Sequence, residues 1–167
     1  MSPTLPSVTG GLIGLNNCNP FNVKQVGPPE IPNSWWQGST GQDEKGHAIF
    51  VRDEYSVRAA VHLLAKYQVN DGLKTLMEIF SKYAPADDPN ANNNPNEYAQ
   101  SVAQHCNVHP GTPLNLFTPE KFINDFTMLI EVLQGMLEFE NYAGCELPCE
   151  TLRSGARLDE FFRRKAA

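Results

Sequence analysis

The sequence has no long apolar run, little positive charge and few cysteines, and each absence excludes a class of protein. It contains no stretch of about eighteen consecutive apolar residues, so we expect no membrane-spanning helix. Lysine and arginine number 13 against 19 aspartates and glutamates, and the net charge is -6. This balance argues against a nucleic-acid partner, because a nucleic-acid surface needs a basic patch. Four cysteines in 167 residues are too few for a disulfide scaffold.

The length of 167 residues is typical of one domain, which buries about two thirds of the surface that the unfolded chain exposes. We therefore expect a single domain over residues 1–167, in which residues 1–14 form a flexible N-terminal segment. The start of the chain lacks a basic stretch and a long apolar centre, so no secretory signal is predicted. A protein of this kind that works outside the cytoplasm needs another delivery route.

Apolar residues recur with helical spacing through most of the chain after residue 53. The pattern predicts helices near residues 53–68, 73–83, 94–106 and 149–164. A longer helix is predicted to open at Thr118, because Pro119 and Glu120 follow this capping residue, and to run to Glu140. Gly144 is well placed to end that helix.

The N-terminal third is rich in proline, glycine and asparagine, which prevents helix propagation. Its short apolar stretches at residues 21–26 and 47–51 are predicted strands of a small sheet, and residues 38–46 are a predicted turn-rich link. The sequence therefore predicts an α+β fold that is mostly α, with a small irregular lobe that contains the β-structure.

Two glutamates stand two positions apart in the stretch GMLEFENYAG at residues 135–144, and helical geometry turns them to different faces. Glu138 falls on the polar side. Glu140 continues the apolar row, which consists of Phe126, Leu129, Ile130, Leu133, Met136 and Leu137. A carboxyl group among apolar neighbours stays protonated near neutral pH and can protonate a leaving oxygen, as cleavage of a glycosidic bond requires. The alternative is that Glu140 turns to solvent or accepts hydrogen bonds from a loop.

Amide and indole side chains are concentrated in two loops. The stretch NNCNPFN carries Asn16, Asn17, Asn19 and Asn22, whose amides donate and accept hydrogen bonds as sugar hydroxyl groups require. In the stretch WWQG, Trp36 offers a flat apolar face on which a sugar ring can lie. An ordinary asparagine-rich turn and a tryptophan buried in the small lobe explain the same residues without a ligand.

Two histidines and two cysteines have spacings that allow a tetrahedral zinc site: His105, His109, Cys145 and Cys149. The pairs stand in the reverse of the usual finger order, and Pro110 interrupts the histidine segment. A disulfide and buried free thiols are the other two interpretations of the cysteines.

In their order along the chain, the motifs NCNPFNVK, WQG, HAIFVRDEYSVRAAVHLLAKY, YAP, NPNEYAQSVA and FEN resemble a family of lysozyme-like bacteriophage proteins. Members of that family are virion-associated peptidoglycan-degrading proteins or endolysins. The resemblance covers about residues 15–142, and the matching positions are Asn19, Pro20, Asn22, Trp36, Gly38, Phe50, Val57, Arg58, Ala59, Ala84, Pro85, Glu140 and Asn141. The chain departs from the family pattern at Phe21, Ser56, Tyr83, Phe139 and Tyr142.

The resemblance implies a single lysozyme-like domain that cleaves the glycan strands of peptidoglycan, as a muramidase or as a lytic transglycosylase. It implies that Glu140 is the catalytic acid, and that the N-acetyl sugars are bound by Asn19, Asn22, Trp36, Gln37 and Asn141. No metal and no cofactor are expected. The fold must then bring Glu140 beside residues 17–22, and Asp53 and Glu54 are the nearest candidates for a second carboxylate.

The resemblance further implies bacterial peptidoglycan and other virion proteins as partners, and a location in the virion or in the host periplasm. The alternative is a non-catalytic phage structural or glycan-docking protein that keeps the fold. Phe21, Phe139 and Tyr142 favour this alternative, because side chains larger than those of the family can fill a sugar subsite.

Overall fold

The computed structural model describes residues 16–28, 30–89, 91–142 and 144–166, so the expected flexible segment at residues 1–14 lies outside the described residues. The fold is α+β and mostly α, as the sequence predicts. The helices are α2 (Asp53–Ala65), α3 (Leu76–Tyr83), α4 (Pro95–Cys106), α5 (Phe126–Glu140) and α6 (Cys149–Ala166), with short π- and 3-10-helical segments η2 (Lys66–Asn70) and η1 (Pro32–Ser34). The strands are β1 (Ser39–Gln42) and β2 (Ala48–Phe50). Within these residues, no helix is long and apolar enough to cross a membrane.

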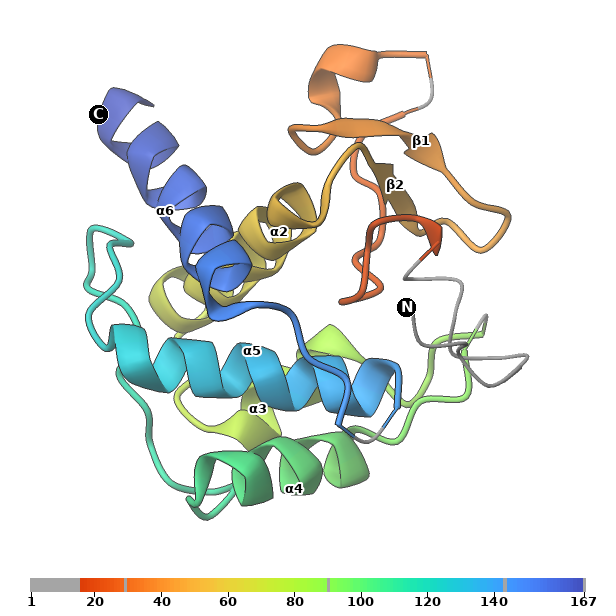
Figure 1. Cartoon of the computed structure of the whole chain (residues 1–167). Helices are drawn as coiled ribbons and strands as arrows, with labels where there is room; N and C mark the ends of the chain where they lie inside the picture. The colour runs from red at the N-terminus through yellow and green to blue at the C-terminus, as the bar shows by residue number, and fades with distance from the viewer. Residues whose placement is uncertain (1–15, 29, 90, 143, 167) are drawn as a thin grey trace, which may run out of the picture.

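Helix α5 lies in the middle of the helical body, with α2 and α6 on one side and α4 on the other (Figure 1). The predicted apolar row of α5 is buried at Leu129, Ile130, Leu133, Met136 and Leu137. Gly135 lets α4 approach closely, because a Cβ atom there would lie 3.2 Å from the Cα atom of Val102. This close contact lies just before the last turn of α5, which carries Glu140.

The start of α5 differs from the sequence expectation. The helix begins at Phe126, and its N-cap is Asp125, whose side chain accepts a hydrogen bond from the N–H of Met128 at 3.0 Å. Thr118 instead opens a tight turn in which its carbonyl accepts a hydrogen bond from the N–H of Lys121 at 2.8 Å. Lys121 has a φ of 68°, a left-handed conformation that a helix interior excludes. At the other end, Asn141 rather than Gly144 caps the helix.

The small lobe is an antiparallel β-hairpin that leads into α2 (Figure 1). Strand β2 confirms the prediction at residues 47–51. The predicted strand at residues 21–26 is instead an extended segment that joins the hairpin through a bridge between Lys24 and His47, because a turn occupies its beginning. The predicted link at residues 38–46 contains β1, and the turn is confined to residues 43–46.

Candidate active site

Glu140 stands at the last position of α5, and its carboxylate receives two hydrogen bonds from distant parts of the chain. The Nδ2 of Asn22 donates to Oε2 at 2.8 Å, and the hydroxyl of Tyr98 donates to Oε1 at 2.9 Å. Asn22 is 118 positions away in the sequence. The expectation that the fold brings Glu140 beside residues 17–22 is therefore confirmed.

Burial raises the pKa of Glu140 from an ordinary value of 4.5 to about 7. The hydrogen bonds from Asn22 and Tyr98 and the charge of Lys24 favour the ionised form and lower the pKa, but the loss of solvation outweighs them. Glu140 nevertheless lines an open pocket. This carboxyl group therefore changes its protonation near neutral pH, and it does so at the wall of an open pocket.

The position of Asn22 follows from a tight turn over residues 19–22. The N–H of Asn22 donates to the carbonyl of Asn19 at 2.9 Å. Asn22 has a φ of 50°, in the left-handed region that asparagine tolerates better than most residues. This conformation turns its amide toward α5, and the turn places a hydrogen-bond donor at the carboxylate.

Asn19, which the sequence suggests as a sugar-binding residue, does not reach the pocket. It is fully buried, and its Nδ2 donates to the carbonyls of Val23 and Ala48, each at 2.9 Å. Its Oδ1 accepts from the N–H of Val23 at 3.0 Å. The amide is used within the loop, so the role of Asn19 is to hold the turn that carries Asn22.

Asn141 also serves the turn rather than the pocket. Its Nδ2 donates to the carbonyl of Pro20 and to that of Leu137, each at 2.9 Å. These bonds join the end of α5 to the asparagine-rich turn. The expectation that Asn141 binds substrate is replaced by this bridging role, because Asn141 is not among the residues that line the pocket.

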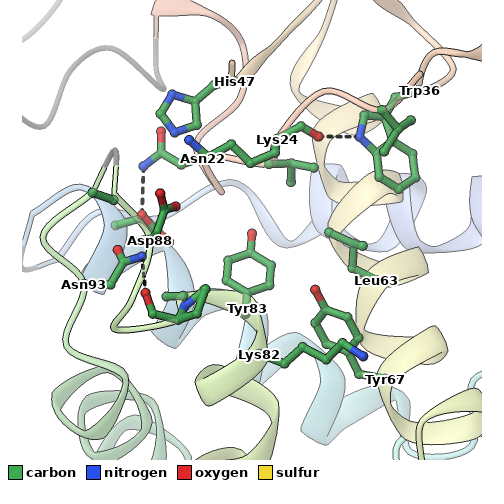
Figure 2. Close-up of a pocket in the computed structure, with 16 residues that line it drawn as sticks. Asn22, Lys24, Trp36, His47, Leu63, Tyr67, Lys82, Tyr83, Asp88 and Asn93 are labelled. Carbon is green, nitrogen blue, oxygen red and sulfur yellow. Dashed lines mark hydrogen bonds between the residues drawn. The ribbon is translucent and has the colours of Figure 1, made fainter. Parts of the chain in front are cut away.

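The pocket beside Glu140 has a volume of about 460 Å³ and lies between the small lobe and the helical body. Figure 2 shows Asn22 and His47 on one side of the pocket and Trp36 on the opposite side. Tyr83 lies near the middle of this view, between Asn22 and Tyr67. Trp36 is held in place because its Nε1 donates to the carbonyl of Lys24 at 2.8 Å. The structure thus brings together Glu140, Asn22 and Trp36, three of the predicted site residues. Gln37 lines a neighbouring pocket instead.

The sequence did not indicate the tyrosines of the site. Tyr98 belongs to the apolar row of α4 and stacks on Phe80 with 4.2 Å between ring centroids. Burial and the neighbouring Glu140 raise the pKa of Tyr98 well above its ordinary value, so it acts as a neutral donor. Tyr83 donates to the carbonyl of Phe21 at 2.6 Å. A tyrosine in the apolar row of a helix was the sequence feature that could have indicated Tyr98, because a buried tyrosine hydroxyl needs a polar partner.

The polar loop after α3 is part of the site as well. Asp88, Ala91 and Asn93 line the pocket, and the Nδ2 of Asn93 donates to the carbonyl of Pro85 at 3.1 Å. Asp53 and Glu54 are not among the lining residues. Among the residues that the structure describes around this pocket, Asp88 is the carboxylate that accompanies Glu140.

The departures from the family pattern lie outside the pocket, with one exception. Phe21 is fully buried in the core, Phe139 packs on Tyr98 with 4.1 Å between centroids, and Tyr142 is 43% exposed. The hydroxyl of Ser56 donates to the carbonyl of Asp53 at 2.7 Å. Only Tyr83 lines the pocket. None of the other four side chains lines the pocket.

The four cysteines are free, and Cys149 is exposed. The structure forms no disulfide between Cys145 and Cys149. In the part of the chain that the structure describes, no group of three or more His, Cys, Asp or Glu side chains could hold a metal ion. His105 instead lies 3.3 Å from Glu131 and 3.8 Å from Glu138, on the polar face of α5.

Replacement of Tyr98 by Phe is expected to raise the pKa of Glu140 above about 7, because a hydrogen bond to the ionised carboxylate is lost while burial remains. An NMR titration of the side-chain carboxyl carbon measures this change. Tyr83→Phe is the matched control, since its hydroxyl donates to a carbonyl rather than to Glu140. An unchanged midpoint in Tyr98→Phe would contradict the assigned hydrogen bond.

A scan against protein-family models found no matching family, and a search of curated proteins found no match.

Proposed function

We propose that this protein cleaves the glycan strands of bacterial peptidoglycan, with Glu140 as the general acid, and that it is a lysozyme-like protein of a bacteriophage. The observation that carries the proposal is the carboxyl group of Glu140, whose pKa burial raises to about 7 although the group lines an open pocket. The general acid that cleaves a glycosidic bond needs a raised pKa of this kind, because it must hold a proton near neutral pH.

In the proposed reaction, Glu140 gives its proton to the oxygen of the scissile glycosidic bond. The bond between that oxygen and the anomeric carbon breaks, and positive charge develops on the sugar ring. Either a water molecule or a hydroxyl group of the same sugar then attacks the anomeric carbon and returns a proton to Glu140. The first route is hydrolysis, and the second leaves an anhydro sugar.

Asn22 and Tyr98 have a positioning role in this scheme. Both donate to the carboxylate, so they orient it and stabilise its ionised form after the proton has left. Asp88 is the side chain that can orient a water or balance the charge on the sugar, because it is the second carboxylate in the lining of the pocket. The face of Trp36 offers a platform for a sugar ring.

Bacterial peptidoglycan is then the macromolecular substrate, and the protein is located in the virion or in the host periplasm. In a virion, the protein has other virion proteins as partners. Phe21, Phe139 and Tyr142 do not line the pocket, so these side chains give no reason to prefer a structural or docking role over an enzymatic one.

The proposal predicts that the protein releases soluble glycan fragments from purified peptidoglycan sacculi, and that the rate falls as the pH rises through about 7. The fall follows because ionisation removes the proton that the reaction needs. Mass spectrometry of the fragments distinguishes hydrolysis from anhydro-sugar formation by the mass of one water. If sacculi bind the protein but release no fragments, the protein is a glycan-docking module and the enzymatic proposal is overturned.

A further inference from the structure

A second pocket of about 560 Å³ lies next to the Glu140 pocket and shares Val26 and Trp36 with it. Its other walls are the loop and first strand of the small lobe, from Pro32 to Ser39, and one face of α2. Trp36 stands across the Glu140 pocket from Asn22 (Figure 2), at the boundary between the two pockets. A chain molecule that lies over Trp36 can therefore occupy both.

The charges around the second pocket differ from those around the first. Arg58 and His62 line it, and no aspartate or glutamate is among its described lining residues, although the chain carries a net charge of -6. Arg58 and His62 are four positions apart on α2 and so share one helix face. Because the carboxylate of the buried Asp159 lies 3.1 Å from the Nδ1 of His62, Arg58 is the lining residue that favours a ligand with negative charge.

Arg58 is suited to a carboxylate. A guanidinium group presents planar, paired N–H donors that match the two oxygens of a carboxylate. Arg58 is half-buried, and burial lowers its pKa, which indicates that water solvates the charge poorly.

The rings beside Arg58 are held in fixed positions. The Nε1 of Trp35 donates to the carbonyl of Pro28 at 3.0 Å. The ring of His62 meets Trp36 edge-on at 5.6 Å, and its Nδ1 lies 3.1 Å from the buried Asp159. The pocket is thus preformed, with apolar ring faces on one side and a cation on the other.

We propose that this second pocket binds a carboxylate carried by the glycan strand that occupies the Glu140 pocket, with Arg58 as the anion-binding residue. The inference rests on the proposed function, since it takes peptidoglycan as the ligand. Peptidoglycan carries such carboxylates on the lactyl groups of its muramic acid residues, or on the stem peptides attached to them, whereas a chitin strand carries none. The pocket therefore selects peptidoglycan over neutral glycans.

Tryptophan fluorescence tests this inference directly, because the chain has 2 tryptophans and both line the second pocket. Glu140→Gln protein is titrated with a tetrasaccharide of alternating N-acetylglucosamine and N-acetylmuramic acid. Three forms of the ligand are used: free lactyl carboxylates, lactyl groups that carry a stem dipeptide, and carboxylates converted to methylamides. We expect at least one charged form to bind about tenfold more tightly than the methylamide, as for a charge-assisted hydrogen bond. The form that shows the preference identifies the source of the carboxylate.

Addition of Arg58→Gln is expected to remove this preference while leaving the affinity for the methylamide unchanged. Arg58→Lys keeps the charge and is expected to keep part of the preference. Arg153→Gln is the matched control, because it removes an exposed arginine that lines neither pocket. Equal affinities for charged and neutral ligands, a preference that survives Arg58→Gln, or no binding of any form would each overturn the inference.

The fluorescence titration needs no catalysis, so its outcome is separate from that of the proposed function. If the wild type releases nothing from sacculi but Arg58 still determines a preference for charged ligands, the carboxylate site stands and the catalytic role fails. If Glu140 is needed for cleavage but the ligands bind equally, the catalytic role stands and the carboxylate site fails.

Discussion

Glu140→Gln is expected to lower the rate of peptidoglycan cleavage by about a hundredfold or more, the size typical of a lost general acid. Glutamine has the shape of the protonated carboxyl group, so it can still accept the hydrogen bond from Tyr98. Its amide can also meet Asn22 after a flip of the Asn22 side chain. The variant therefore keeps the pocket and loses only the transferable proton.

The loss of turbidity of Gram-negative cells stripped of their outer membrane measures this effect. Glu138→Gln is the control, because Glu138 lies on the same helix, two positions earlier, with its side chain 38% exposed. We expect this control to clear cells at the wild-type rate. Equal clearing by wild type and Glu140→Gln would show that Glu140 is not the acid.

The same substitution is expected to stabilise the fold above pH 7. The pKa of Glu140 is raised from 4.5 to about 7 on folding, so the folded state holds this proton more tightly than the unfolded state. Wild-type stability therefore falls as the pH rises from 4.5 through about 7. Above pH 7 the cost of the buried charge is fully present and amounts to about 3 kcal/mol. Glutamine cannot ionise, so Glu140→Gln escapes this cost.

Urea unfolding at pH 5 and at pH 8, followed by circular dichroism, checks this second expectation. The difference in unfolding free energy between variant and wild type should be larger at pH 8 by roughly 2–3 kcal/mol. A rise of the same size in Glu138→Gln would show that the effect comes from net charge rather than from burial. A difference that does not change with pH would contradict the raised pKa.

Local patterns were sufficient to predict most of the helical body. Asn94 caps α4 and Pro95 begins it, as expected from the sequence. The same kind of signal was wrong at Thr118, because a capping residue followed by proline suits a tight turn as well as a helix. The turn forms there because Lys121 adopts a left-handed conformation and because Phe117 forms a bridge with Ile123. The spacing of residues in the sequence reveals neither feature.

The candidate site could be predicted only in part, since it forms where distant segments meet. The apolar row of α5 predicted which side of the helix is buried and that Glu140 turns inward at its end, because one helix is enough to define a row. Asn19 and Asn22 are the same residue type in the same loop, and only the direction of the turn places one in the core and the other at Glu140. Tyr98 joins the site through the packing of α4 against α5, which no local pattern contains.

The distance between Asn22 and Glu140 along the chain has a consequence for how the protein is made. Synthesis proceeds from the N-terminus, so the turn of Asn22 and the platform of Trp36 leave the ribosome well before α5, whose last residue is Glu140. A nascent or truncated chain that lacks this residue lacks the proposed acid. The chain therefore cannot acquire its proposed activity before α5 is complete and α6, which packs against α2, has followed it out of the ribosome.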